Sequence, residues 1–175
     1  MSVRSAEKRA EQILSEFGIV CPPINLEKIA KEMKIHIQYE SFDGELSGIL
    51  IRNEELGEYV IGVNKEHADT RKRFTIAHEI GHFLLHEGNE TYIDRSIRYN
   101  FRDADSSQGT NMDEMEANAF AATLLMPEEM IEEYIENNHG YIDYNDDKEI
   151  RKMAETFQVS VQALMIRLAK LRKFD

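Results

Sequence analysis

The chain has 175 residues, of which 42% are hydrophobic and 31% are charged, which suits one hydrophobic core with a small appended subdomain. Its formal net charge of −12 argues against a protein whose whole surface binds nucleic acid. Its single cysteine, Cys21, excludes an intrachain disulfide, and no apolar signal segment or membrane-length apolar run is present, so we expect a cytoplasmic protein that is not inserted in a membrane.

The first part of the chain is predicted to form two helices and a small sheet. Apolar residues at helical spacing predict a helix over 5–17, and Asn25 can cap a second helix over 26–33. Three short β-branched segments bounded by turn residues are typical of strands: 35–39, 46–52 and 59–63. Because the turns between them are short, we expect an antiparallel meander.

The rest of the chain is predicted to be mainly helical. A helix that contains His78 begins near Arg71 and ends before Gly88. The segment 89–111 is polar and irregular, and we expect it to border a cleft beside this helix, because long connections inside small domains are often functional. Further helices are expected over 112–125, from Pro127 onward, over 146–157 and over 160–171.

The most informative pattern is His78-Glu79-Ile-Gly-His82. Its two histidines are four residues apart, so on a helix they lie on one face and can bind one zinc ion together. Glu79 then lies beside the open coordination position, where it can accept a proton from an activated water molecule. The alternative is an ordinary amphipathic helix with exposed histidines, but three of the chain's six histidines fall on this one stripe.

A catalytic zinc site usually has three protein ligands, so one more is needed. His86 follows His78 by eight residues, which separates their Cα atoms by about 12 Å along a helix axis. A straight helix cannot bring all three imidazoles to one ion. His86 is therefore expected to support the site from outside, to face the substrate, or simply to be exposed.

The helix predicted over 112–125 supplies two better candidates. Glu116 shares a face with the apolar Phe120 and Leu124, as a ligand that points into a core requires, so we favour Glu116. Glu114, which shares a face with Asn118, is the alternative. If neither binds metal, both glutamates are solvent-facing charges near the helix N-terminus.

Two stretches of the sequence resemble the ImmA/IrrE family of zinc metallopeptidase-like proteins. They are residues 73–86, Arg-Phe-Thr-Ile-Ala-His-Glu-Ile-Gly-His-Phe-Leu-Leu-His, and residues 116–127, Glu-Ala-Asn-Ala-Phe-Ala-Ala-Thr-Leu-Leu-Met-Pro. Weaker likenesses lie at 22–30, 46–48 and 157–168.

The resemblance implies an α+β, gluzincin-like fold, in which a small antiparallel sheet packs on the His78 helix and a glutamate-bearing helix. It implies His78, His82 and Glu116 as zinc ligands and Glu79 as the general base. We expect a zincin-like domain over 1–140 and a packed, helix-turn-helix-like helical subdomain over 141–175.

The resemblance also implies a function, because members of the family cleave or antagonise DNA-binding repressors in phages, mobile elements and stress responses. We therefore predict a zinc-dependent peptidase whose partner is a helix-turn-helix repressor or a similar regulatory protein. Four residues are candidates to stabilise the oxyanion, and the sequence does not rank them: Tyr92, Arg98, Tyr99 and His139.

Two alternatives remain open. A non-catalytic anti-repressor could bind its partner with a purely structural zinc, although such a site does not need a carboxylate at position 79. A DNA-binding regulator could use the last two helices, of which the final one is basic: Arg167, Lys170, Arg172 and Lys173. Direct contact with nucleic acid is not expected, because the rest of the chain is acidic.

Overall fold

The computed structural model describes residues 2–42, 46–53, 57–86, 91–94, 108–138, 140–144 and 146–171. Within these ranges the helices are α1 (Val3–Glu16), α2 (Leu26–Glu32), α3 (Asp69–Leu85), α4 (Gln108–Leu125), α5 (Glu128–Asn137), α6 (Asp147–Phe157) and α7 (Val161–Leu171). The strands are β1 (Ile35–Glu40), β2 (Gly48–Asn53), β3 (Glu58–Asn64) and β4 (Thr91–Asp94). The α+β class expected from the sequence is confirmed.

The strands form one mixed sheet in the order β1-β3-β2-β4. β2 is antiparallel to β3 and β4, whereas β1 runs parallel to β3. The expected antiparallel meander is therefore wrong for β1, which pairs with β3 and not with its neighbour in sequence. β3 takes a central place because its Ile61 and Val63 are fully buried, while most of β1 after Ile35 is exposed, as suits an edge.

Part of the segment expected to be irregular has regular structure. β4 lies within it and adds a fourth strand beside β2, with Gly48 opposite Asp94. The helix expected to begin at residue 112 begins at Gln108.

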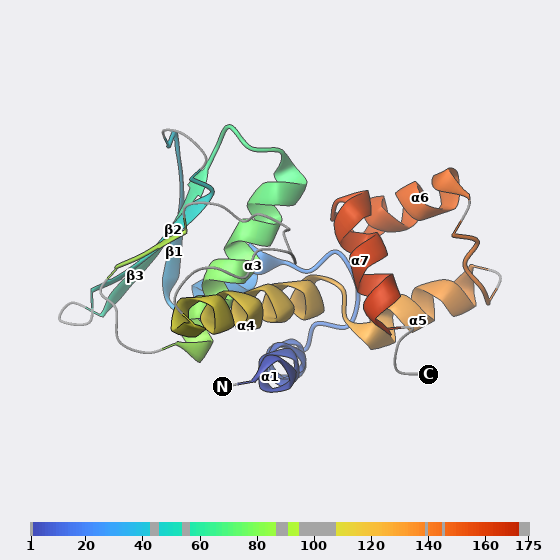
Figure 1. Cartoon of the computed structure of the whole chain (residues 1–175), viewed down its shortest axis with the longest axis horizontal. Helices are drawn as coiled ribbons and strands as arrows, with labels where there is room; N and C mark the ends of the chain where they lie inside the picture. The colour runs from blue at the N-terminus through green and yellow to red at the C-terminus, as the bar shows by residue number, and fades with distance from the viewer. Residues whose placement is uncertain are drawn as a thin grey trace.

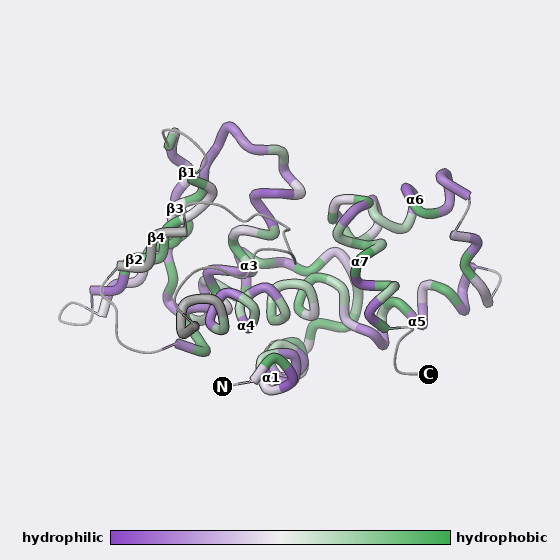
Figure 2. The backbone as a smooth tube through the Cα atoms, in the orientation of Figure 1, coloured by the Kyte–Doolittle hydropathy of each residue, from purple (hydrophilic) through white to green (hydrophobic). Residues whose placement is uncertain are grey.

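The helices lie to one side of the sheet (Figure 1). α3 packs against β2 and β3, and α4 packs against both α3 and α1. Figure 2 shows hydrophobic residues where α1, α3 and α4 meet, and hydrophilic residues at the outer end where α5 leads to α6. The core at this junction includes Ile13, Ile80 and Phe120, each at most 1% exposed.

The C-terminal helices are capped and tied to the rest of the chain. Asp146 caps α6, and the hydroxyl oxygen of Ser160 accepts a hydrogen bond from the backbone N–H of Ala163. The guanidinium of Arg167 donates to the carbonyl of Met126 at 3.0 Å. A domain boundary after residue 140 and a helix-turn-helix identity for α6 and α7 stay predictions.

Among the described residues, no helix combines the length and the apolar character needed to cross a lipid bilayer.

Candidate metal centre

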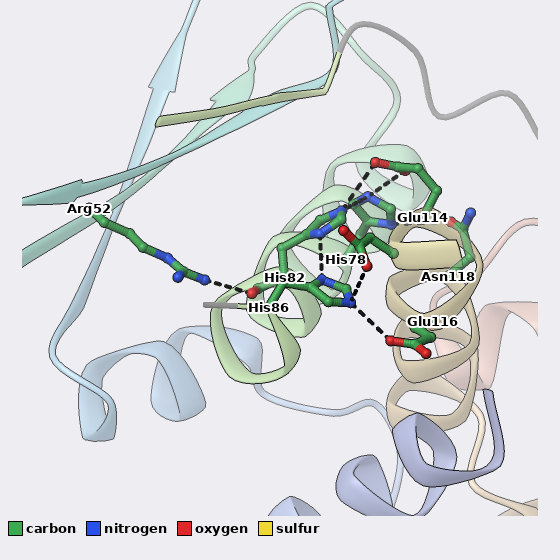
Figure 3. Close-up of polar contacts among 8 residues, drawn as sticks. Arg52, His78, His82, His86, Glu114, Glu116 and Asn118 are labelled. Carbon is green, nitrogen blue, oxygen red and sulfur yellow. Dashed lines mark hydrogen bonds and ion pairs between the residues drawn. The ribbon is translucent and has the colours of Figure 1, made fainter. Parts of the chain in front are cut away.

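The two histidines of the predicted motif face each other on α3. The Nε2 atoms of His78 and His82 are 2.9 Å apart, and both side chains are at most 1% exposed (Figure 3). The four-residue spacing thus places both rings on one face, one turn apart, as the sequence predicted.

A carboxylate from α4 completes the cluster. Glu114 Oε2 lies 3.3 Å from His78 Nε2, and Glu114 Oε1 lies 3.4 Å from His82 Nε2. Glu116, which the sequence favoured, is buried as expected, but its Oε2 lies 3.1 Å from His86 Nε2 instead. The structure therefore brings His78 and His82 together with Glu114 and places Glu116 beside a different histidine.

The cluster fits a metal ion in donor type and in spacing. Two imidazole nitrogens and a carboxylate oxygen are the donors that zinc takes in catalytic sites. Two atoms bound to one zinc ion at about 2.0–2.1 Å in tetrahedral geometry lie roughly 3.3 Å apart. The separations of 2.9–3.4 Å between the three donors agree with that value.

Both rings are held from behind by a hydrogen bond to their other nitrogen. His78 Nδ1 lies 3.1 Å from Asn118 Oδ1, and His82 Nδ1 lies 3.0 Å from His86 Nδ1. Because an amide oxygen only accepts, His78 must donate from Nδ1, which leaves the Nε2 lone pair directed at the cluster.

Glu79 is fully buried, and β2 passes close to it. A Cβ on Gly48 would lie 3.0 Å from Glu79 Oε1 and 2.4 Å from Thr75 Cγ2. Glycine is therefore required here, because any side chain would displace α3 from the sheet or move the Glu79 carboxylate. The likeness at 46–48 was the only sequence signal for this contact.

The family model of the IrrE N-terminal-like domain (Peptidase_M78) matches residues 30–169. The chain belongs to this family. The match runs from α2 into α7 and so contains the whole cluster and its supporting residues.

A solved structure, that of a Mycobacterium tuberculosis transcriptional regulator, is similar to this IrrE-like chain with a TM-score of 0.60. The two are 14% identical, and the alignment covers 96% of this chain and 47% of the regulator, so this chain spans about half of its length. At this identity the likeness shows the fold alone. Among curated proteins, no sequence matches the chain significantly.

In this family member, the surroundings of the cluster shift the pKa values of His82 and Glu114 in directions that favour the binding of a cation. Burial lowers the pKa of His82 to about 4, so its ring is neutral at pH 7 and can offer a lone pair. Burial alone raises the pKa of Glu114, but its contacts with His78 and His82 outweigh burial and hold the pKa below its ordinary value. His82 thus contributes a neutral ring to the donor set, and Glu114 contributes a carboxylate.

Arg52 is a supporting residue that the sequence did not reveal. From β2 it donates to the carbonyl of His82 at 2.6 Å (Figure 3). Its guanidinium lies 5.6 Å from the centre of the Phe83 ring. This bond satisfies a carbonyl in the last turn of α3 and ties that turn to the sheet. No local sequence pattern indicates such a contact, because the two residues are thirty positions apart.

The four candidates for oxyanion stabilisation stay predictions. Arg98, Tyr99 and His139 lie outside the described residues, and only the backbone of Tyr92 is described, in β4.

Two of the four basic residues near the C-terminus contact other parts of the chain. Arg167 is 5% exposed, and Lys170 Nζ lies 2.5 Å from Glu7 Oε1 on α1. Arg172 and Lys173 lie outside the described residues. Arg167 is therefore buried within the chain, and Lys170 forms an ion pair with α1.

Proposed function

We propose that this IrrE-like protein is a zinc-dependent peptidase that acts on a DNA-binding repressor or a similar regulatory protein. The observation that carries the proposal is the convergence of His78, His82 and Glu114, with Glu79 buried on the same helix as the two histidines.

In this proposal His78, His82 and Glu114 hold the metal. A zinc ion bound there would lower the pKa of water and polarise the carbonyl of a peptide bond. Glu79 accepts the proton of the attacking water and passes it to the leaving amine. Its buried position where α3 packs against β2 supports this role, because close packing against the sheet holds the carboxylate in a fixed position.

The sheet offers a place for an extended substrate. β4 is at the end of the strand order, so within the described part of the chain its outer edge is available for pairing. A substrate backbone that adds to this edge would be held extended, as in β-augmentation.

A basic regulatory protein suits the charge of the chain. The net charge is −12, and α5 exposes several acidic side chains: Glu128, Glu129, Glu132, Glu133 and Glu136. DNA-binding proteins carry positive charge for phosphate contacts, so the two would attract each other at long range. The burial of Arg167 and the ion pair of Lys170 with Glu7 support a protein partner over DNA, because both cations already have partners within the chain.

The test is proteolysis by the zinc-loaded wild type and by Glu79→Gln. Each is incubated with a purified helix-turn-helix repressor and with a degenerate peptide library, and the products are identified by mass spectrometry. We expect defined cleavage by the wild type, and cleavage slower by about 100-fold or more for Glu79→Gln with its zinc retained. Equal cleavage by both proteins, or repressor binding without cleavage by either, would contradict the proposal.

A further inference from the structure

Beside the candidate metal centre lies a second group of possible ligands. His86 Nε2 is 3.1 Å from Glu116 Oε2 (Figure 3). It is 3.6 Å from Asp113 Oδ1. These three side chains are close enough together to hold an ion of their own. The group is joined to the first cluster through His82 and His86, whose Nδ1 atoms are 3.0 Å apart.

The contact between the two Nδ1 atoms limits what each ring can do. One Nδ1 must donate and the other must accept, so in neutral rings one histidine has its proton on Nδ1 and the other on Nε2. Only a nitrogen without a proton can bind a metal. The direction of this one hydrogen bond therefore decides which of the two rings offers Nε2 to an ion.

If His82 binds metal through Nε2, its Nδ1 is the donor and His86 Nδ1 is the acceptor. The proton of His86 is then on Nε2 and faces Glu116 Oε2 at 3.1 Å, where it forms a second hydrogen bond. If His86 binds metal instead, its Nδ1 donates, and His82 has its proton on Nε2, facing His78 and Glu114. While both rings are neutral, the two groups of ligands cannot each bind a metal ion at the same time.

Burial and packing favour the first arrangement. Glu116 is 1% exposed and meets His86 within hydrogen-bonding distance, whereas the side chain of Asp113 is 44% exposed and stands farther off. A buried carboxylate is stabilised by a donated N–H, which only the first arrangement supplies from His86 Nε2. His86 itself follows the last residue of α3, with φ −122° and ψ 117°, so its ring is not constrained to the direction of the helical side chains.

We propose that Glu116 and His86 are positioning residues, which fix the tautomer and orientation of His82 and so commit the chain to one metal ion. Hydrogen bonds run from Glu116 through His86 to His82, and we call these three residues the relay. The relay places the Glu116 carboxylate two hydrogen bonds behind the metal-binding ring of His82. Asp113 is not part of the relay. The inference rests on the metal centre of the proposed function and adds the residues that select its ligand set.

Zinc affinity of the full chain, measured by competition with a chelator, tests the relay. We expect one zinc per wild-type chain and binding weakened about tenfold or more by Glu116→Gln, which keeps the size of the side chain but loses its charge. Asp113→Asn is the matched control and should change the affinity less than about twofold, because at 3.6 Å Asp113 is too far from His86 Nε2 for a hydrogen bond. Circular dichroism checks that each variant is folded.

Two substitutions of His86 separate positioning from packing. In His86→Asn the amide oxygen can replace Nδ1 as the acceptor for His82, whereas the longer glutamine of His86→Gln reaches toward the position of Nε2. We expect the asparagine variant to bind zinc more tightly than the glutamine variant. Equal loss in both would overturn the relay.

The proton positions can be observed in the wild type without any substitution. In long-range ¹H–¹⁵N spectra of the zinc-loaded protein, His82 should have its proton on Nδ1 and His86 on Nε2. The reverse pattern, two zinc ions per chain, or unchanged affinity in Glu116→Gln would overturn the relay while the metal centre stands. Failure of the wild type to bind zinc would overturn both.

Discussion

Gly81 of α3 lies so close to Ala117 of α4 that a Cβ on Gly81 would be 3.3 Å from both the Cα and the carbonyl oxygen of Ala117. Glycine inside a helix costs about 1 kcal/mol relative to alanine, so this position is explained by the close approach of the two helices. Ala117 stands between Glu114 and Asn118, whose side chains meet His78. The contact of two small residues therefore sets how far the ligands of one helix reach toward those of the other.

Gly81→Val should lower both the stability of the fold and the affinity of the metal centre for zinc. The larger side chain must push α4 away, because Phe120 and Ala117 already stand within about a contact distance, and overpacking of this kind costs about 1–3 kcal/mol. We expect a lower melting temperature for the zinc-free protein and weaker zinc binding in calorimetry. Glu155→Val, at an exposed position of α6, is the control for the helix propensity of valine. An equal effect of both substitutions would show that the helix contact is not the cause.

Metal content distinguishes the two glutamates. Glu114→Ala should leave the purified chain without zinc, because it removes a carboxylate that contacts both His78 Nε2 and His82 Nε2. Glu116→Ala should retain one zinc per chain at saturating zinc, with lower affinity. Mass spectrometry of the native proteins gives both results, and loss of zinc chiefly in Glu116→Ala would restore the ligand set that the sequence favoured.

The sequence predicts the arrangement of site residues correctly where those residues are close together along the chain. The spacing of His78 and His82 determines that both rings share a face of α3, and this holds in the structure. Which glutamate of α4 reaches the two histidines depends instead on how that helix is rotated about its own axis. Burial of Glu116 was anticipated correctly, but burial does not identify the partner, and the Gly81–Ala117 contact directs Glu114 toward the histidines.

The sheet shows the same limit. Each strand segment of the first half was found from its own residues, because β-branched runs and turn residues are local signals. Pairing is not local, so the parallel contact of β1 with β3 did not follow from short turns. β4 has only four residues in a polar segment and is placed by its pairing with β2, which no periodicity reveals.

Gly48→Ala should reduce catalysis more than metal binding. The added Cβ would overlap Thr75 and approach Glu79 Oε1, so the carboxylate has to move, while the ligands on α3 and α4 keep their contacts. We expect a loss of kcat in the peptidase assay with zinc content unchanged. Gly18→Ala, at a positive φ with no neighbour within 4 Å of the added Cβ, controls for the general effect of replacing a glycine. A matching loss of activity in both would argue against a special role for β2 beside Glu79.

The stability of the zinc-free protein should fall as the pH is lowered from about 6.5 to about 4. Burial lowers the pKa of His82 from 6.5 to about 4, so between these values the unfolded chain binds a proton that the folded chain does not. Unfolding is therefore favoured as the pH falls, by at most about 3 kcal/mol from this residue. Denaturant unfolding of wild type and His82→Phe across this range measures the difference, since other titrating groups contribute to both proteins. We expect the wild type to lose more stability than the variant, and parallel pH profiles would show that His82 is not held neutral by burial.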